Sequence, residues 1–157
     1  MTRIYTPVQI PLPVQIVFEY VTTPGHWPEW HPSSLGVSDA TDHSLEIGEQ
    51  VTEEFLVAGR RGQAIWTVKE RVVPFRWVIE GEVNGRKSGI VTYTLGPQDN
   101  GTYFEREFVY SMPNFLVGLL DRFVLRRRIE AESKQAVQQL RSALLRQRGN
   151  VAKETGQ

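Results

Sequence analysis

The chain has 157 residues, of which 40% are apolar and 23% are charged, a composition typical of a globular domain with an ordinary core. Its 18 basic and 18 acidic side chains cancel, so no net field would attract nucleic acid. The chain has no cysteine, which excludes disulfides, thiolate nucleophiles and cysteine-ligated metals.

The N-terminal part predicts one strand followed by two short helices. Residues 3–10 alternate weakly between apolar and polar side chains, which indicates a strand that ends at the prolines of 11–13. Apolar side chains recur with helical spacing over residues 14–21, so we expect an amphipathic helix there. Residues 24–32 hold three prolines, two tryptophans and two histidines, and they predict a single helical turn bounded by prolines.

The middle of the chain has the pattern of an antiparallel meander. Short runs of β-forming residues alternate with tight turns. The expected strands are residues 35–39, 50–58, 63–73, 75–83, 87–95 and 102–110. We expect turns at 59–62 and at Asn84–Gly85, where both residues tolerate a positive φ.

The last element is a long helix. It is expected to begin at Pro113, which suits the first helical position, and to end at Arg148, before the helix-stop pair Gly149–Asn150. About 35 residues at ~1.5 Å rise give a rod of roughly 50 Å. Its first half is apolar nearly all round, whereas the second half has a narrower apolar stripe. We therefore expect one domain over residues 1–148 and a flexible polar tail over residues 149–157.

This order, β-α-α-β6-α, predicts an α+β fold in which a curved antiparallel sheet wraps around the long C-terminal helix. A curved sheet must bury one face, and only the terminal helix is large enough to cover it. The two short helices cannot fill the remaining space completely. We therefore expect an apolar cavity between the sheet and the helix.

Several local motifs resemble the START-like superfamily, also called SRPBCC, which includes polyketide cyclase/dehydrase-like proteins and the birch-pollen allergen family. The matching segments are residues 10–13, 17–21, 23–24, 27–30, Pro32, the turn at 101–102 and the C-terminal helix. The resemblance covers about residues 3 to 147. It implies a helix-grip fold whose cavity binds a lipid, polyketide, sterol or similar apolar molecule, and it assigns no catalytic residues.

Strand alternation predicts which side chains line this cavity. Taking the more apolar face of each strand as the inner one places three charged residues inside, namely Glu53, Glu70 and Arg106. A buried Arg106 would need a carboxylate partner or a ligand anion. The candidate ligand-binding residues are Trp27, Glu53, Phe55, Trp66, Glu70, Trp77, Tyr93, Phe104, Arg106, Phe108, Tyr110, Leu119 and Phe123.

Other polar residues have alternative interpretations. His26 and His31 are five residues apart with no third ligand nearby, so we expect no metal site, although one of them can face the cavity as an acid–base group. Arg122 or Arg126 can face the cavity and meet an anionic head group, or both can be surface charges.

The predicted function is the binding of a small hydrophobic ligand, without turnover and without a cofactor. The first alternative is a polyketide cyclase or dehydratase that uses the same cavity, with proton transfer by His26, His31, Tyr93 or Glu70. The second is a protein–protein adaptor, and a neutral chain favours a homodimer. No apolar run reaches ~18 residues and the N-terminus lacks a signal-peptide stretch, so we expect a cytoplasmic protein without stable membrane insertion.

Overall fold

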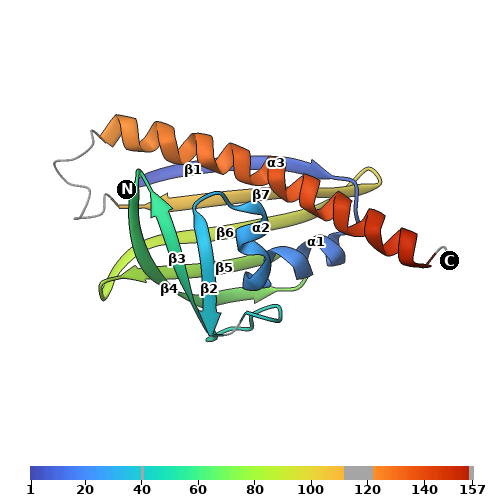
Figure 1. The fold of residues 1–157 in the computed structure, drawn as a ribbon, viewed down its shortest axis with the longest axis horizontal. Helices are drawn as coiled ribbons and strands as arrows, with labels where there is room; N and C mark the ends of the chain where they lie inside the picture. Colours follow the sequence, from blue (N-terminus) through green and yellow to red (C-terminus); the bar gives the residue numbers. More distant parts are fainter. Residues whose placement is uncertain (40, 112–121, 156–157) are drawn as a thin grey trace.

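The computed structural model describes residues 1–39, 41–111 and 122–155. One antiparallel sheet curves around a long C-terminal helix, and two short helices lie between them (Figure 1). This arrangement confirms the predicted α+β helix-grip fold. The elements are β1 (Thr2–Ile10), α1 (Val14–Val21), the 3-10 turn η1 (Pro24–His26), α2 (Trp27–Trp30), β2 (Ser34–Asp39), β3 (Gln50–Val57), β4 (Arg60–Val72), β5 (Arg76–Val83), β6 (Arg86–Gln98), β7 (Gly101–Tyr110) and α3 (Arg122–Thr155).

The sheet has seven strands in the order β1-β7-β6-β5-β4-β3-β2. Strands β2 to β7 form the predicted meander, and β1 completes the sheet by pairing with β7. Alternate side chains of β1 are buried, as the pattern predicted, because one face of the strand is turned toward the helices. The inner face of the sheet and the helices together enclose the core.

Two turns set the register of the meander. Asn84 and Gly85 both have positive φ, at 53° and 74°, as expected for the tight hairpin between β5 and β6. The turn between β3 and β4 was predicted at residues 59–62, and this was wrong. The turning residues are Ala58 and Gly59, with φ of 53° and 77°, and Arg60 already belongs to β4.

A bulge in β4 reverses part of the predicted inner face. The register with β5 shifts between Val68 and Glu70, so side chains after Val68 exchange faces. Glu70 therefore points to solvent and pairs with Arg76 at 2.9 Å, each side chain being 45% exposed. Arg71 turns toward the core instead, where its guanidinium lies 5.6 Å from the centre of the Phe18 ring.

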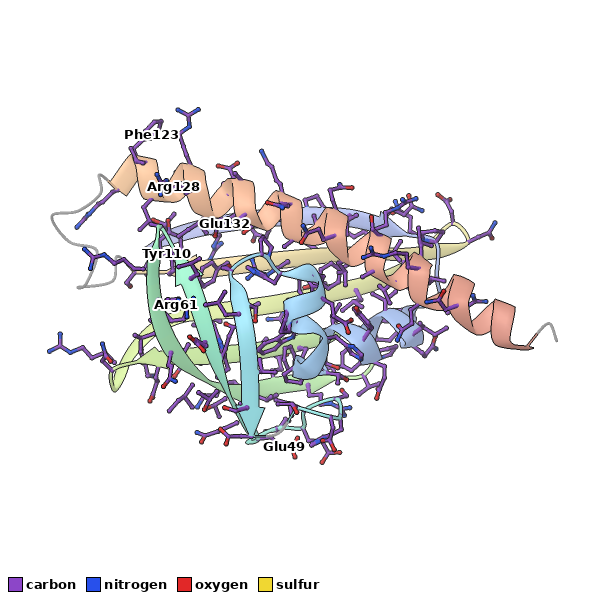
Figure 2. All side chains as sticks on the ribbon, in the orientation of Figure 1. Glu49, Arg61, Tyr110, Phe123, Arg128 and Glu132 are labelled. Carbon is purple, nitrogen blue, oxygen red and sulfur yellow. The ribbon has the colours of Figure 1, made fainter. Side chains whose placement is uncertain are left out.

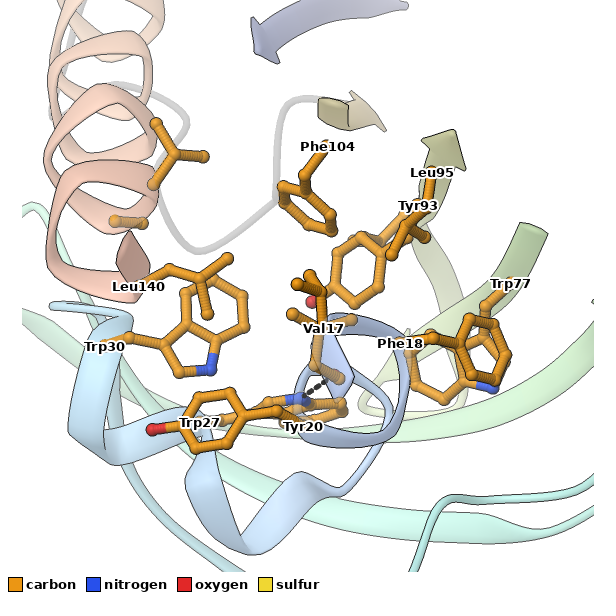
Figure 3. Packing of buried hydrophobic residues seen from close by; sticks show 14 of the residues in the cluster. Val17, Phe18, Tyr20, Trp27, Trp30, Trp77, Tyr93, Leu95, Phe104 and Leu140 are labelled. Atoms are coloured by element: carbon orange, nitrogen blue, oxygen red, sulfur yellow. Dashed lines mark hydrogen bonds between the residues drawn. The ribbon is translucent and has the colours of Figure 1, made fainter. Parts of the chain in front are cut away.

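The helical turn α2 is held against α1 by aromatic side chains (Figure 3). The Trp27 indole Nε1 donates a hydrogen bond of 3.0 Å to the backbone oxygen of Val21 at the end of α1. The Tyr20 hydroxyl donates to Glu29 Oε2 at 2.5 Å, and the Tyr20 ring stacks on His26 with centroids 4.2 Å apart. These contacts fix α2 over the inner face of the sheet, as expected for a turn bounded by prolines.

Helix α3 lies along β1 and contacts α2. Its second half buries a narrow apolar stripe, as predicted, and the stripe includes Ile129, Ala136, Leu140 and Leu144, each at most 8% exposed. The predicted end at Arg148, before Gly149, was wrong, because α3 continues to Thr155. A glycine inside a helix costs only about 1 kcal/mol relative to alanine, which the surrounding helix-forming residues offset.

The apolar segment predicted from residue 113 onward lies outside the described residues as far as residue 121. Among the described helices, none is long and apolar enough to cross a membrane.

Candidate functional site

A cavity of about 140 Å³ lies between the inner face of the sheet, α2 and α3. Its described lining is mostly apolar and aromatic, with a small group of polar side chains. The lining residues are Trp27, Trp30, His31, Ser33, Glu53, Phe55, Val57, Ala64, Trp66, Ile79, Val83, Ser88, Val91, Tyr93, Arg106, Phe108, Tyr110, Ser111, Leu125 and Ile129. An apolar hollow with a few converging polar groups is the usual form of a small-molecule site.

The polar group is centred on Arg106 of β7. This side chain is 6% exposed, and its Nη1 donates a hydrogen bond of 3.3 Å to the Ser133 hydroxyl of α3. Its Nε is buried without a hydrogen-bond partner, and its guanidinium lies 5.4 Å from the centre of the Phe108 ring. Within residues 1–39, 41–111 and 122–155, no carboxylate lies at ion-pair distance from Arg106. The cavity wall therefore carries a buried cation without a direct counter-charge.

Glu53 of β3 is the acidic member of the polar group. Its Oε1 accepts a hydrogen bond of 3.1 Å from Trp66 Nε1. Burial raises the pKa of Glu53, whereas Ser34, Trp66 and the charge of Arg106 oppose the shift. The Ser34 hydroxyl lies near Glu53 but makes no hydrogen bond of good geometry. Desolvation thus moves this carboxyl toward its neutral form in the apolar cavity.

His31 is a neutral hydrogen-bond donor in the cavity wall. Burial and the nearby charge of Arg106 hold the pKa of His31 well below its usual range. Its Nδ1 accepts the backbone N–H of Ser33 at 3.3 Å and lies 2.9 Å from the Ser33 hydroxyl. A backbone N–H can only donate, so the ring proton must be on Nε2. That Nε2 is buried, and no residue in the described part of the chain accepts a hydrogen bond from it.

Tyr93 of β6 completes the polar group. It is the cross-strand partner of Arg106 and is 3% exposed. Burial raises the pKa of Tyr93 to about 12, so the phenol is neutral at physiological pH. Its ring lies 5.2 Å from Phe104 and 5.4 Å from Trp77, which anchors it to the core.

Glycines on neighbouring strands make room for the aromatic wall. A Cβ on Gly81 would lie 2.7 Å from the Trp66 ring, and Gly62 and Gly89 stand in the same relation to Phe55 and Phe108, at 2.5 Å and 2.8 Å. These rings therefore occupy the space that a side chain at each glycine would need. The depth of the cavity depends on these close approaches, because any larger residue would displace a ring into it.

Most of the predicted site residues are brought together by the fold. Those that line the cavity are Trp27, Glu53, Phe55, Trp66, Tyr93, Arg106, Phe108 and Tyr110. Trp77 and Phe104 face inward but are fully buried core residues below the cavity wall, each 0% exposed. Glu70 lies on the outer surface because of the bulge in β4.

The predicted site residues on the C-terminal helix were less accurate. Phe123 is 65% exposed and points away from the sheet at the start of α3, whereas Tyr110 lies beneath that helix (Figure 2). Leu119 lies outside the described residues. Arg122 and Arg126 are exposed, and the α3 residues that reach the cavity are Leu125 and Ile129. The hydrophobic stripe would have identified Ile129, but no local signal sets the rotation of the helix at its start.

Sequence reasoning missed other lining residues from the short N-terminal elements. Trp30 was not among the candidate ligand-binding residues, yet it borders the cavity while being 1% exposed. His31 was one of two histidines expected to be able to face the cavity, the other being His26. No sequence pattern pointed to Ser33 as a lining residue. Groups of three or more histidine, cysteine or acidic side chains with metal-binding geometry are absent from the described part of the chain.

A curved sheet closed by a long helix over an apolar cavity defines a helix-grip protein of the START-like class. The chain belongs to the family described as polyketide cyclase / dehydrase and lipid transport, which it matches over residues 1–144. Among curated proteins it is similar to penitrem biosynthesis cluster 1 protein I of Penicillium ochrochloron. The two are 29% identical over 108 residues, which cover 62% of this chain and 68% of that protein.

Solved structures share the fold at low sequence identity. Protein TTHA0849 from Thermus thermophilus superposes with a TM-score of 0.71 at 14% identity, covering 92% of this chain and 97% of that one. Protein BH1534 from Bacillus halodurans gives 0.69 at 18% identity, with the same coverage of both chains. The Aha1 dimer from Colwellia psychrerythraea gives 0.64 at 15% identity, covering 92% of this chain and 96% of that one. These similarities establish the fold.

Proposed function

We propose that this protein binds a small apolar molecule in the cavity between the sheet and α3. The observation that carries this proposal is the apolar hollow of about 140 Å³, walled by three tryptophans and other aromatic rings. Apolar cavities of about 150 Å³ in other proteins take up benzene-sized molecules. The volume therefore suits a ligand of one or two rings, or one end of a longer molecule. Membership of the family supports a ligand-binding or polyketide-related role.

Filling the cavity should weaken ligand binding without unfolding the protein. Ala64 lines the cavity, and its neighbour Ile65 is 43% exposed on the outer face of the same strand. We expect Ala64→Phe to weaken binding of 2-naphthol about tenfold or more, because the new ring occupies the ligand's space. The control Ile65→Phe should leave the affinity unchanged. Quenching of tryptophan fluorescence measures both affinities, and equal binding by the two variants would refute the cavity as the site.

A second candidate function, acid–base catalysis of a cyclisation or dehydration, is favoured by the contrast between His31 and Glu53. His31 presents a neutral Nε2–H that no described residue accepts, which suits a hydrogen bond that polarises a substrate carbonyl, and Glu53 is a carboxyl with a raised pKa in the same cavity, which suits proton transfer. Two titratable groups in one cavity whose surroundings shift their pKa values in opposite directions are typical of acid–base catalysis.

The two candidates differ in how they respond to His31→Gln. An enzyme should lose product formation about 100-fold while retaining most of its substrate affinity. A binding protein should return every ligand unchanged, with or without the substitution. Mass spectrometry of β-hydroxy ketone ligands after incubation detects the loss of water, and its absence with the wild-type protein would exclude dehydration of those ligands.

A further inference from the structure

We propose that the Arg106 guanidinium, held in place by its hydrogen bond to the Ser133 hydroxyl, forms an anion-binding end of the cavity, and that the ligand is a one- or two-ring apolar molecule with a single carboxylate. This inference rests on the proposed ligand-binding function and names the chemical class of the ligand.

The charge of Arg106 is the first argument. An arginine side chain stays protonated in proteins, so β7 carries a fixed positive charge into an apolar cavity. A buried charge without a paired counter-charge is costly. The acidic side chain that lines the same cavity, Glu53, is hydrogen-bonded to Trp66 and shifted toward its neutral form. A ligand anion would supply the missing counter-charge.

The geometry of the guanidinium favours a carboxylate. Nη1 is occupied by the Ser133 hydroxyl at 3.3 Å, whereas Nε on the other edge is buried and has no partner. Nε and Nη2 lie on the same edge of the guanidinium with their N–H groups parallel, and the hydroxyl of Tyr93, the cross-strand partner of Arg106, is a hydrogen-bonding neighbour of the same side chain. A carboxylate binds such an edge with two parallel hydrogen bonds. The neutral Nε2–H of His31, also on the cavity wall and without a partner, adds a further donor for an oxygen atom.

The charge of the site disfavours a dianion. One guanidinium compensates one negative charge, and no other cationic side chain is found among the described residues that line the cavity. A dianionic phosphate would therefore remain uncompensated in an apolar space. The aromatic rings around Arg106, including Phe108 at 5.4 Å, suit the flat hydrocarbon part of the ligand.

A pair of nearly isosteric probes tests the inference in the wild-type protein at neutral pH. Calorimetric titration should give about tenfold or more tighter binding of 2-naphthoate than of 2-naphthamide, because only the acid gains charge-assisted hydrogen bonds. Equal affinities for the two probes would overturn the anion site while leaving the ligand-binding function intact. Failure of both probes to bind would reject the ligand-binding function for this class, and the anion site with it.

Variants then assign the preference to Arg106. Arg106→Met should weaken 2-naphthoate about tenfold or more and leave 2-naphthamide within about twofold. Arg106→Lys keeps the positive charge but loses the paired N–H donors of the guanidinium. This variant should therefore retain only part of the preference for 2-naphthoate over 2-naphthamide. The matched control is Arg71→Met, which removes another inward arginine that does not line the cavity, and it should preserve the preference. If Arg106→Met retains the full preference, or if Arg71→Met loses it, the assignment to Arg106 is wrong.

Discussion

Replacing Trp77 with alanine is expected to lower the free energy of unfolding by about 3–5 kcal/mol, the range for removing a large buried ring. Trp77 is 0% exposed on β5, and its ring stacks on Tyr93 at 5.4 Å and meets Trp27 edge-on at 6.3 Å. Its Nε1 donates a hydrogen bond of 3.1 Å to the backbone oxygen of Leu45. The substitution would leave a cavity and an unpaired carbonyl together, and chemical denaturation measures the loss.

An aromatic residue on the outer face gives the matched control. Tyr103 of β7 is 38% exposed, and Tyr103→Ala should cost much less, about 0.5 kcal/mol. Should Trp77→Ala fail to fold, Trp77→Phe keeps most of the ring and loses the hydrogen bond to Leu45, which is worth about 1–3 kcal/mol when the carbonyl is left unpaired. Because Trp77 does not line the cavity, this variant should retain its ligand affinity. If Trp77→Phe lost ligand affinity while its free energy of unfolding stayed unchanged, Trp77 would have to be counted among the ligand-binding residues.

Replacing Gly81 with alanine should change both stability and ligand binding. The new Cβ would lie 2.7 Å from the Trp66 ring, so the ring must move away from the sheet and into the cavity. This shift would also strain the hydrogen bond of 3.1 Å from Trp66 to Glu53. We expect a loss of about 1–3 kcal/mol in the free energy of unfolding, as for overpacked cores. Naphthalene-sized ligands should bind about tenfold more weakly, because they share the space that the ring would enter.

The control for Gly81 is the same substitution elsewhere on the sheet. Gly96 of β6 has no described neighbour within 4 Å of the position that a Cβ would take. Gly96→Ala should therefore leave ligand affinity unchanged and raise stability slightly, by up to about 1 kcal/mol, since alanine restricts the unfolded chain. Equal effects of the two substitutions would mean that strand glycines do not control the depth of the cavity. Thermal unfolding and naphthol titration measure both variants.

The predicted cavity wall was most accurate where strand alternation is uninterrupted. Glu53 and Phe55 on β3, and Arg106 and Phe108 on β7, all line the cavity as the period of two required. The prediction for Glu70 was wrong because a bulge adds one residue to β4. No residue type near the bulge indicates it in the sequence. Helix residues were harder, since the rotation of α3 decides that Leu125 and not Phe123 is buried.

The homodimer expected from the neutral charge stays a prediction, as do the domain limits and the cytoplasmic location. The Aha1 structure from Colwellia psychrerythraea is described as a dimer, and at 15% identity it informs only the fold of this chain.

By itself, the sequence determined the order of the elements, the hairpin at Asn84–Gly85 and the inward face of most strands, because turn chemistry and side-chain periodicity act over a few residues. Tertiary structure alone decided that Arg106 meets Ser133 of α3, that His31 borders the same hollow, and that Gly81 lies beneath Trp66. These contacts join residues far apart in the chain, and their geometry depends on the curvature of the sheet and the rotation of the helix. No local pattern encodes either quantity, so the apolar cavity was predictable whereas its polar end was not.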